Sequence, residues 1–155
     1  MNIEAKLRWE RAPHEGFIQG NYRRTHRWSF DGGATFHVSS SPHIVAIPFS
    51  DPAHADPEEM FVASISSCHM LFFLSLASRR NLVVDAYTDS PVAVLAKDDA
   101  GMMCVRRVTL CPVVTFLDPQ CADADTLKAI HHQAHASCFL ANSVKTEITF
   151  QFDNL

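Results

Sequence analysis

The sequence has no run of basic residues. Its 13 lysines and arginines are scattered and are outnumbered by 17 acidic residues, which gives a formal net charge of -4. Proteins that bind nucleic acid or an anionic membrane through charge carry a clustered basic patch. We therefore expect neither of these partners. The N-terminus is charged from Glu4 onward and has no apolar stretch of signal-peptide length, so we also expect a cytoplasmic protein.

Cysteine pairs of the CxxC type are absent as well. The chain has 5 cysteines, an odd number, at spacings that fit neither a secreted disulfide scaffold nor a structural zinc module. A reducing compartment with one or two functional thiols fits this pattern better. The five are Cys68, Cys104, Cys111, Cys121 and Cys138.

Internal repeats, low-complexity tracts and long linkers are also missing. With 155 residues, of which 47% are hydrophobic, the chain can build one sizeable core, and we expect a single domain over residues 1–155. Residues 60–77 carry no formal charge and approach the length of a membrane span. Serines, a histidine and a cysteine interrupt this stretch, which favours a buried central helix.

The start of that helix has the clearest local signal in the sequence. Asp56 can act as N-cap, Pro57 suits the first helical position, and Glu59 stands where a capping box needs an acid. The signals predict a helix over about residues 57–80, apolar around most of its circumference and surrounded by other elements. A second helix is expected from near Asp123 or Asp125 to near residue 142, with Cys138 on its buried face.

The remaining runs are typical of strands, with β-branched or alternating apolar residues. Turn residues at 31–33 and 98–101 predict hairpins. The resulting order is β-β-β-α-β-β-α-β, an α+β fold with antiparallel sheets around two central helices. The expected strands are residues 3–10, 21–30, 34–41, 82–96, 102–116 and 145–152.

Three segments resemble the OsmC/Ohr-like family. DPEEMFVASISSCHMLFFLSLA is similar to the family's first cysteine helix, AHASCFLANSVKTEITF to its second cysteine helix and last strand, and YRRTHRWSFDGGATFHVSSSP to its N-terminal strand pair. The resemblance implies an OsmC-like fold, a homodimer, and a thiol-dependent hydroperoxide reductase of oxidative stress defence. It implies no cofactor and no metal. Its partners would be a small hydroperoxide and a dithiol reductant.

The same resemblance assigns residues to roles. It implies Cys68 as the peroxidatic cysteine, Cys138 as the resolving cysteine, Glu58 as the acid of an Arg-Glu pair, and Arg24 as its arginine. His69 after the first cysteine and the residues 139–142 after the second differ from typical Ohr sequences. These differences indicate a distinct OsmC-like branch.

Physical arguments narrow the choice of a cation for the thiolate. Cys68 lies too deep in its helix to use the positive end of the helix dipole, so a cationic side chain must stabilise it. Arg24 is preferred because it shares a strand face with aromatic residues, whereas Arg23 and Arg27 point the other way. About 15 Å of helix separate Glu58 from Cys68. Glu58 therefore acts either through a bent helix start or in the site of another subunit.

Two rival interpretations stay open. His131, His135 and Cys138 follow i, i+4, i+7 spacing and could face one metal, with Cys68 or His69 as a further ligand. Alternatively, the protein could be an OsmC-fold redox sensor or small-ligand-binding module without peroxidase turnover.

Overall fold

The computed structural model describes residues 1–152. The chain forms two compact units, Met1–Met60 and Phe61–Leu155. The expectation of a single domain stays a prediction.

The first unit contains a small antiparallel sheet in the order β1-β2-β3. Its strands are β1 (Ala5–Arg8), β2 (His26–Phe30) and β3 (Thr35–Val38). The turn between β2 and β3 has Gly33 at φ 86°, a conformation that favours glycine, and this confirms the predicted hairpin. The second strand begins at His26 and not at residue 21 as expected, because the preceding backbone leaves the sheet and Arg24 N donates to Phe49 O.

Helix α1 (Pro57–Arg79) begins where the capping signals place it. Asp56 Oδ1 accepts from the backbone N–H of Glu59 at 2.8 Å, and Glu59 Oε2 accepts from the N–H of Asp56 at 3.0 Å. This is a reciprocal capping box. After the helix, Asn81 adopts a positive φ of 58°, which ends it within one residue of the expected position.

Within the chain, α1 buries one stripe rather than its whole circumference. Ile65, His69, Phe73 and Ala77 follow four-residue spacing and are buried, whereas Leu71 is 61% exposed. Within a single chain, the surrounding elements therefore cover only part of the helix. By length and composition α1 could cross a membrane, but core helices of soluble proteins pass the same test, so one such helix is weak evidence.

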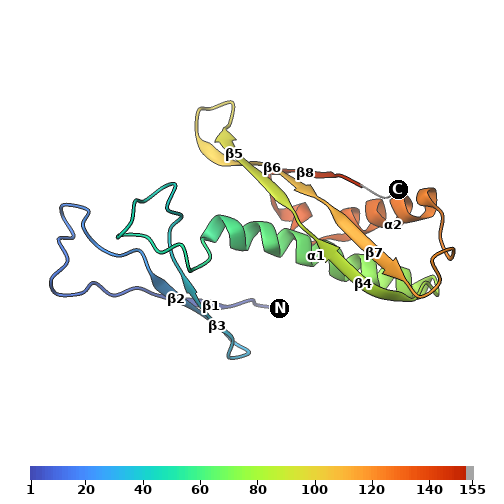
Figure 1. Cartoon of the computed structure of the whole chain (residues 1–155), viewed down its shortest axis with the longest axis horizontal. Helices are drawn as coiled ribbons and strands as arrows, with labels where there is room; N and C mark the ends of the chain where they lie inside the picture. The colour runs from blue at the N-terminus through green and yellow to red at the C-terminus, as the bar shows by residue number, and fades with distance from the viewer. Residues whose placement is uncertain (153–155) are drawn as a thin grey trace. The chain divides into compact units, whose positions relative to one another are not determined.

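The second unit contains a long, broken antiparallel hairpin (Figure 1). Each of the two expected strands is divided in two, at Ser90–Pro91 and at Cys111, directly before Pro112. Proline lacks the N–H that a continuous ladder needs, so the chain changes sheets there. β4 pairs with β7 and β5 with β6, both antiparallel, as the predicted hairpin requires. The strands are β4 (Val84–Asp89), β5 (Val92–Lys97), β6 (Met103–Leu110) and β7 (Pro112–Phe116).

The last strand, β8 (Glu147–Phe150), runs parallel to β6. The α+β class is confirmed, but one of the sheets, β5-β6-β8, is mixed and not antiparallel as expected. Helix α2 (Ala124–Ser137) begins at its N-cap Asp123, whose side chain accepts from Thr126 N. The helix ends five residues before the expected residue 142, because Cys138 is extended (φ -68°, ψ 118°) and caps it.

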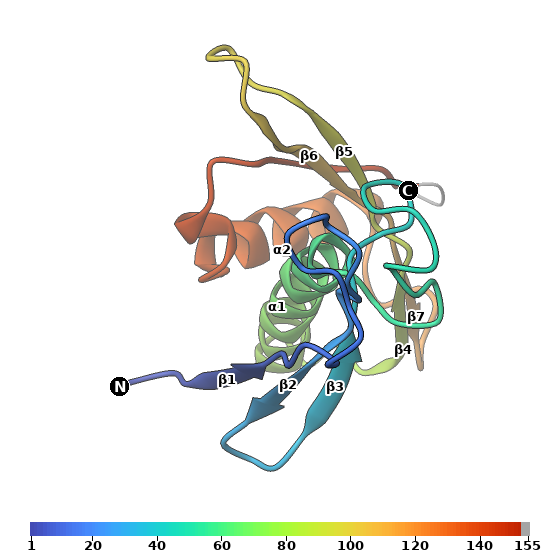
Figure 2. The same cartoon turned by 90° about the vertical axis from the view of Figure 1, so that its left-hand side faces the viewer.

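A short 3-10 helix, η1 (Ala141–Ser143), follows α2. The two long helices lie next to each other in the second unit (Figure 2). Phe73 and Ala77 of α1 pack with Ile130 and Ala134 of α2 and with Phe116 of β7. This core fixes the rotation of each helix about its axis, and so fixes which polar side chains meet between them.

Candidate functional site

Two cysteines meet where α1 passes the end of α2. The thiol of Cys138 donates to Cys68 Sγ at 2.8 Å, and both cysteines are reduced. Cys68 lies in the middle of α1 and is partly exposed, whereas Cys138 is only 1% exposed. A molecule arriving from solvent can therefore reach Cys68, with Cys138 directly behind it.

The surroundings of Cys138 favour its neutral form. Burial raises the pKa of the Cys138 thiol, and its hydrogen bond to Cys68 raises it further. The backbone N–H of Ala141 donates to Cys138 Sγ at 3.4 Å, and this weaker contact lowers the Cys138 pKa. Phe72 follows Cys68 by four residues and Phe139 follows Cys138 directly, and their rings meet edge to face with centroids 5.1 Å apart.

The residue after Cys68 makes a second contact between the helices. His69 Nε2 lies 3.0 Å from His131 Nδ1, and the two rings are stacked with an interplanar angle of 5°. Both side chains are buried, with 1% and 2% exposure. Burial lowers the pKa of His69 to about 3 and that of His131 to about 4, and neighbouring imidazoles add to both shifts. Both rings are therefore neutral at physiological pH.

Aromatic side chains enclose this histidine pair. The ring of His131 stacks on Phe73 at 4.3 Å and lies 5.0 Å from Phe152, while His69 lies 5.0 Å from Phe150. From the sequence we named His69 as a difference from typical Ohr sequences and both histidines as possible metal ligands, but we missed their mutual hydrogen bond. The residues are 62 positions apart, and no local spacing signal links them.

Residues 1–152 do not form the metal arrangement that was kept open as a rival interpretation. Within residues 1–152, no group of three or more His, Cys, Asp or Glu side chains could hold a metal ion. His131 pairs with His69, Cys138 pairs with Cys68, and the His135 ring meets Phe150 edge to face at 5.6 Å. The helix ends before Cys138, so the i, i+4, i+7 face is not continuous.

Arg24 lies in the first unit, outside β2. Its guanidinium stands 3.7 Å above the ring of Tyr22 and donates to the carbonyl oxygens of Gly20 and Tyr22. The strand face expected to carry Arg24 starts only at His26, whose Nε2 accepts from Trp28 Nε1 at 2.9 Å. Arg24 therefore precedes β2 and does not lie on the strand face that the sequence predicted.

Glu58 occupies the first turn of α1 and is half-buried. Both Glu58 and Arg24 belong to the unit Met1–Met60, whereas Cys68 and Cys138 belong to the unit Phe61–Leu155. The roles expected of Arg24 and Glu58 toward the thiolate therefore stay predictions.

Known proteins share this architecture. An OsmC-like protein of unknown function from Vibrio cholerae is 43% identical, with a TM-score of 0.95, and the match covers 98% of this chain and 99% of that one. An organic hydroperoxide resistance protein from Legionella pneumophila is 14% identical (TM-score 0.67, covering 98% and 95%). The organic hydroperoxide resistance protein OhrB of Bacillus subtilis is 16% identical (TM-score 0.66, covering 99% of this chain and 98% of that one). These two show the fold alone.

A search of curated proteins found no match. The model of the OsmC-like protein family, however, matches residues 50–153, which include both cysteines and both long helices. With a relative of 43% identity over nearly its whole length, the chain belongs to the OsmC-like protein family.

Proposed function

We propose that this protein is a cysteine-based thiol peroxidase that reduces organic or related hydroperoxides and serves in defence against oxidative stress. The observation that carries the proposal is the 2.8 Å contact between a partly exposed Cys68 and a buried Cys138. Membership of the OsmC-like family supports it, because solved proteins of the same fold are named organic hydroperoxide resistance proteins.

In the first half of the reaction, the Cys68 thiolate attacks the terminal oxygen of the hydroperoxide. The O–O bond breaks, the leaving alkoxide takes a proton and departs as the alcohol, and Cys68 becomes a sulfenic acid. Cys68 is suited to this role because it is the more accessible of the two sulfurs. The aromatic pair Phe72 and Phe139 would contact the organic part of the substrate.

In the second half, Cys138 condenses with the sulfenic acid. Its thiol loses a proton as its sulfur attacks Cys68, the hydroxyl leaves as water, and a disulfide forms. The raised pKa of Cys138 keeps it protonated until that step. A disulfide bond is about 2.05 Å long, so the sulfurs need to approach each other by less than about 1 Å. A dithiol reductant then supplies two electrons and restores both thiols.

The thiolate needs a cation, and we assign that role to Arg24, with Glu58 holding the guanidinium. The exposed face of α1 around Leu71 would pack against a second copy of the chain in a homodimer. The Arg24 and Glu58 that serve one Cys68 would then come from its own chain or from the partner. We place the protein in the cytoplasm, where dithiol reductants are present.

Anaerobic thiol counting tests the proposal most directly. One equivalent of cumene hydroperoxide should remove two thiols per chain, and peptide mass spectrometry should locate the disulfide between Cys68 and Cys138. The other three cysteines lie outside the two helices: Cys104 in strand β6, Cys111 between β6 and β7, and Cys121 in a loop. The triple variant Cys104→Ser, Cys111→Ser, Cys121→Ser is therefore the matched control. It should respond in the same way.

Two outcomes would reject peroxidase turnover. If the disulfide forms but dithiothreitol does not sustain peroxide consumption, the protein is a redox sensor. If all thiols stay reduced while the protein remains folded, the thiol chemistry is absent and a ligand-binding role takes its place.

A further inference from the structure

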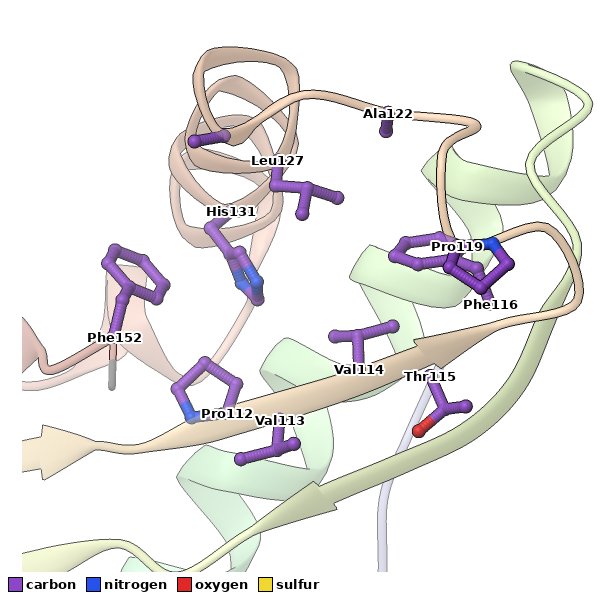
Figure 3. A pocket seen from close by; sticks show the side chains of 11 residues that line it. Pro112, Val113, Val114, Thr115, Phe116, Pro119, Ala122, Leu127, His131 and Phe152 are labelled. Carbon is purple, nitrogen blue, oxygen red and sulfur yellow. The ribbon is translucent and has the colours of Figure 1, made fainter. Parts of the chain in front are cut away.

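A cavity of about 410 Å³ lies between strand β7 and helix α2 (Figure 3). All of its lining residues belong to the second unit, and neither Cys68 nor Cys138 is among them. Its volume is within the range of small-molecule sites, which runs from about 300 to 1,000 Å³. The cavity is therefore large enough for a ligand and separate from the thiol pair.

The side chains that face this cavity are nearly all apolar. Side chains alternate along a strand, and in Figure 3 Pro112, Val114 and Phe116 point from β7 toward α2 while Thr115 points away. Leu127 lies opposite them on α2. Among residues 1–152, the one ionisable lining side chain is His131, whose ring reaches from α2 into the cavity beside Phe152.

The hydrogen bond to His69 determines which nitrogen of His131 carries the proton. A neutral imidazole has one N–H, so either His69 Nε2–H donates to His131 Nδ1, or the reverse. In the reverse case the proton of His69 would sit on Nδ1, which is buried and has no partner within residues 1–152. Buried N–H groups without a partner are rarer and costlier than unused acceptor lone pairs. The first arrangement is therefore favoured.

It follows that His131 carries its proton on Nε2, the ring nitrogen not engaged by His69. This leaves the Nε2–H of His131 as a hydrogen-bond donor at a cavity whose lining side chains are mostly apolar. From this geometry we infer a second, unassigned binding site, which takes a small, neutral, mainly apolar molecule through one acceptor oxygen, such as a ketone, ester or ether. An apolar body would meet the lining side chains, and the His131 donor would orient it.

Two probes of matched shape test the inference. Acetophenone carries a carbonyl where ethylbenzene has a methylene group, and neither compound reacts with cysteine thiols during a titration. Each is titrated into isotope-labelled full-length protein while the amide NMR signals are followed. Saturable shifts should centre on β7 and the first turns of α2. One net hydrogen bond predicts that acetophenone binds about two- to tenfold more tightly than ethylbenzene.

Variants on the two faces of β7 provide a matched pair. Val114→Phe fills the cavity and should abolish the shifts, whereas Thr115→Val changes the opposite face and should leave them unchanged. If Val114→Phe fails to fold, the titrations of wild-type protein with the two probes still test the inference. A histidine ring NMR spectrum should show the His131 proton on Nε2 and the His69 proton on Nε2.

Several results would overturn the inference. Equal affinity for the two probes would remove the donor role of His131, and a proton on His131 Nδ1 would do the same. The absence of saturable shifts, or shifts centred elsewhere, would mean that no ligand enters the cavity, as expected if a second copy of the chain covers it. Because the readout is binding, these results do not depend on the proposed peroxidase chemistry.

Discussion

The thiol of Cys138 points at Cys68 Sγ across 2.8 Å, and the two sulfurs differ sharply in their access to solvent. In the proposed reaction, that asymmetry would give the two cysteines different roles. An oxidant would reach Cys68 first, and the sulfenic acid formed there would meet a thiol already in place. Cys138 would then lose its proton and displace water to complete the disulfide.

The single serine variants should therefore fail in different ways. In Cys68→Ser the nucleophile is gone, so no rapid oxidation should follow addition of tert-butyl hydroperoxide. In Cys138→Ser the Cys68 thiol should still be lost, but the reaction should stop at sulfenic acid, which dimedone traps. Mass spectrometry of the adduct is the measurement. Wild type should give little adduct, because Cys138 captures the sulfenic acid first. Equal labelling of both variants would contradict the assignment.

The cation that supports Cys68 should be identified by comparing neighbouring arginines. Arg24→Gln should slow oxidation of Cys68 by about tenfold or more, because the thiolate is the reacting form and would lose the cation proposed to stabilise it. The rate is measured by stopped flow from the loss of free thiol. Glu58→Gln should cause a smaller loss, since it acts through the arginine. Arg23→Gln and Arg27→Gln are the controls, and a larger effect in either one would transfer the role to that residue.

The prediction of a dimer depends on the outer face of α1. Leu71 is 61% exposed in the single chain, near the middle of a helix that buries only one stripe. Light scattering at micromolar concentration should give twice the chain mass of 17.3 kDa. Leu71→Arg should shift the mass toward the monomer, since a buried unpaired charge opposes association. Lys97→Arg, on strand β5, keeps its charge and should not shift it. A monomeric wild type would contradict the prediction.

Local signals predicted the start of α1 because its determinants are neighbours in the chain. Asp56 and Glu59 cap each other across three residues, and no other part of the fold is required. The strand boundaries depended on distant partners. The strand breaks next to Pro91 and Pro112 could be located only from the sheet pairing, in which β4 and β5 belong to different sheets. The parallel pairing of β8 with β6 is likewise invisible in a pattern of alternating residues.

The candidate site likewise combines features that the local sequence predicts with features that depend on distant residues. The sequence predicted two helices carrying one cysteine each, and the family resemblance supplied their roles. The place of Cys138 as the cap that ends α2 was missed, because the extended backbone there has no proline or glycine to signal it. The contact between His69 and His131 was missed as well, since it depends on the rotation of two helices about their axes.

The last prediction concerns stability at low pH. In the folded protein, burial lowers the pKa of His69 to about 3 and that of His131 to about 4, whereas an unfolded histidine titrates near about 6.5. The unfolded chain therefore binds more protons below about pH 6.5. The stability that the neutral pair contributes is complete above that pH. It is lost progressively as the pH falls from about 6.5 toward 4.

Urea denaturation at several pH values between 7 and 4 measures this loss. His131→Gln keeps an acceptor for His69 Nε2–H but cannot titrate, so its unfolding free energy should fall less steeply, by at most the slope of one proton, about 1.4 kcal/mol per pH unit. His43→Gln removes an exposed histidine and should retain the wild-type slope. If His131→Gln also retains that slope, His131 is not held neutral by the fold. The donor inferred at the cavity would then lose its basis.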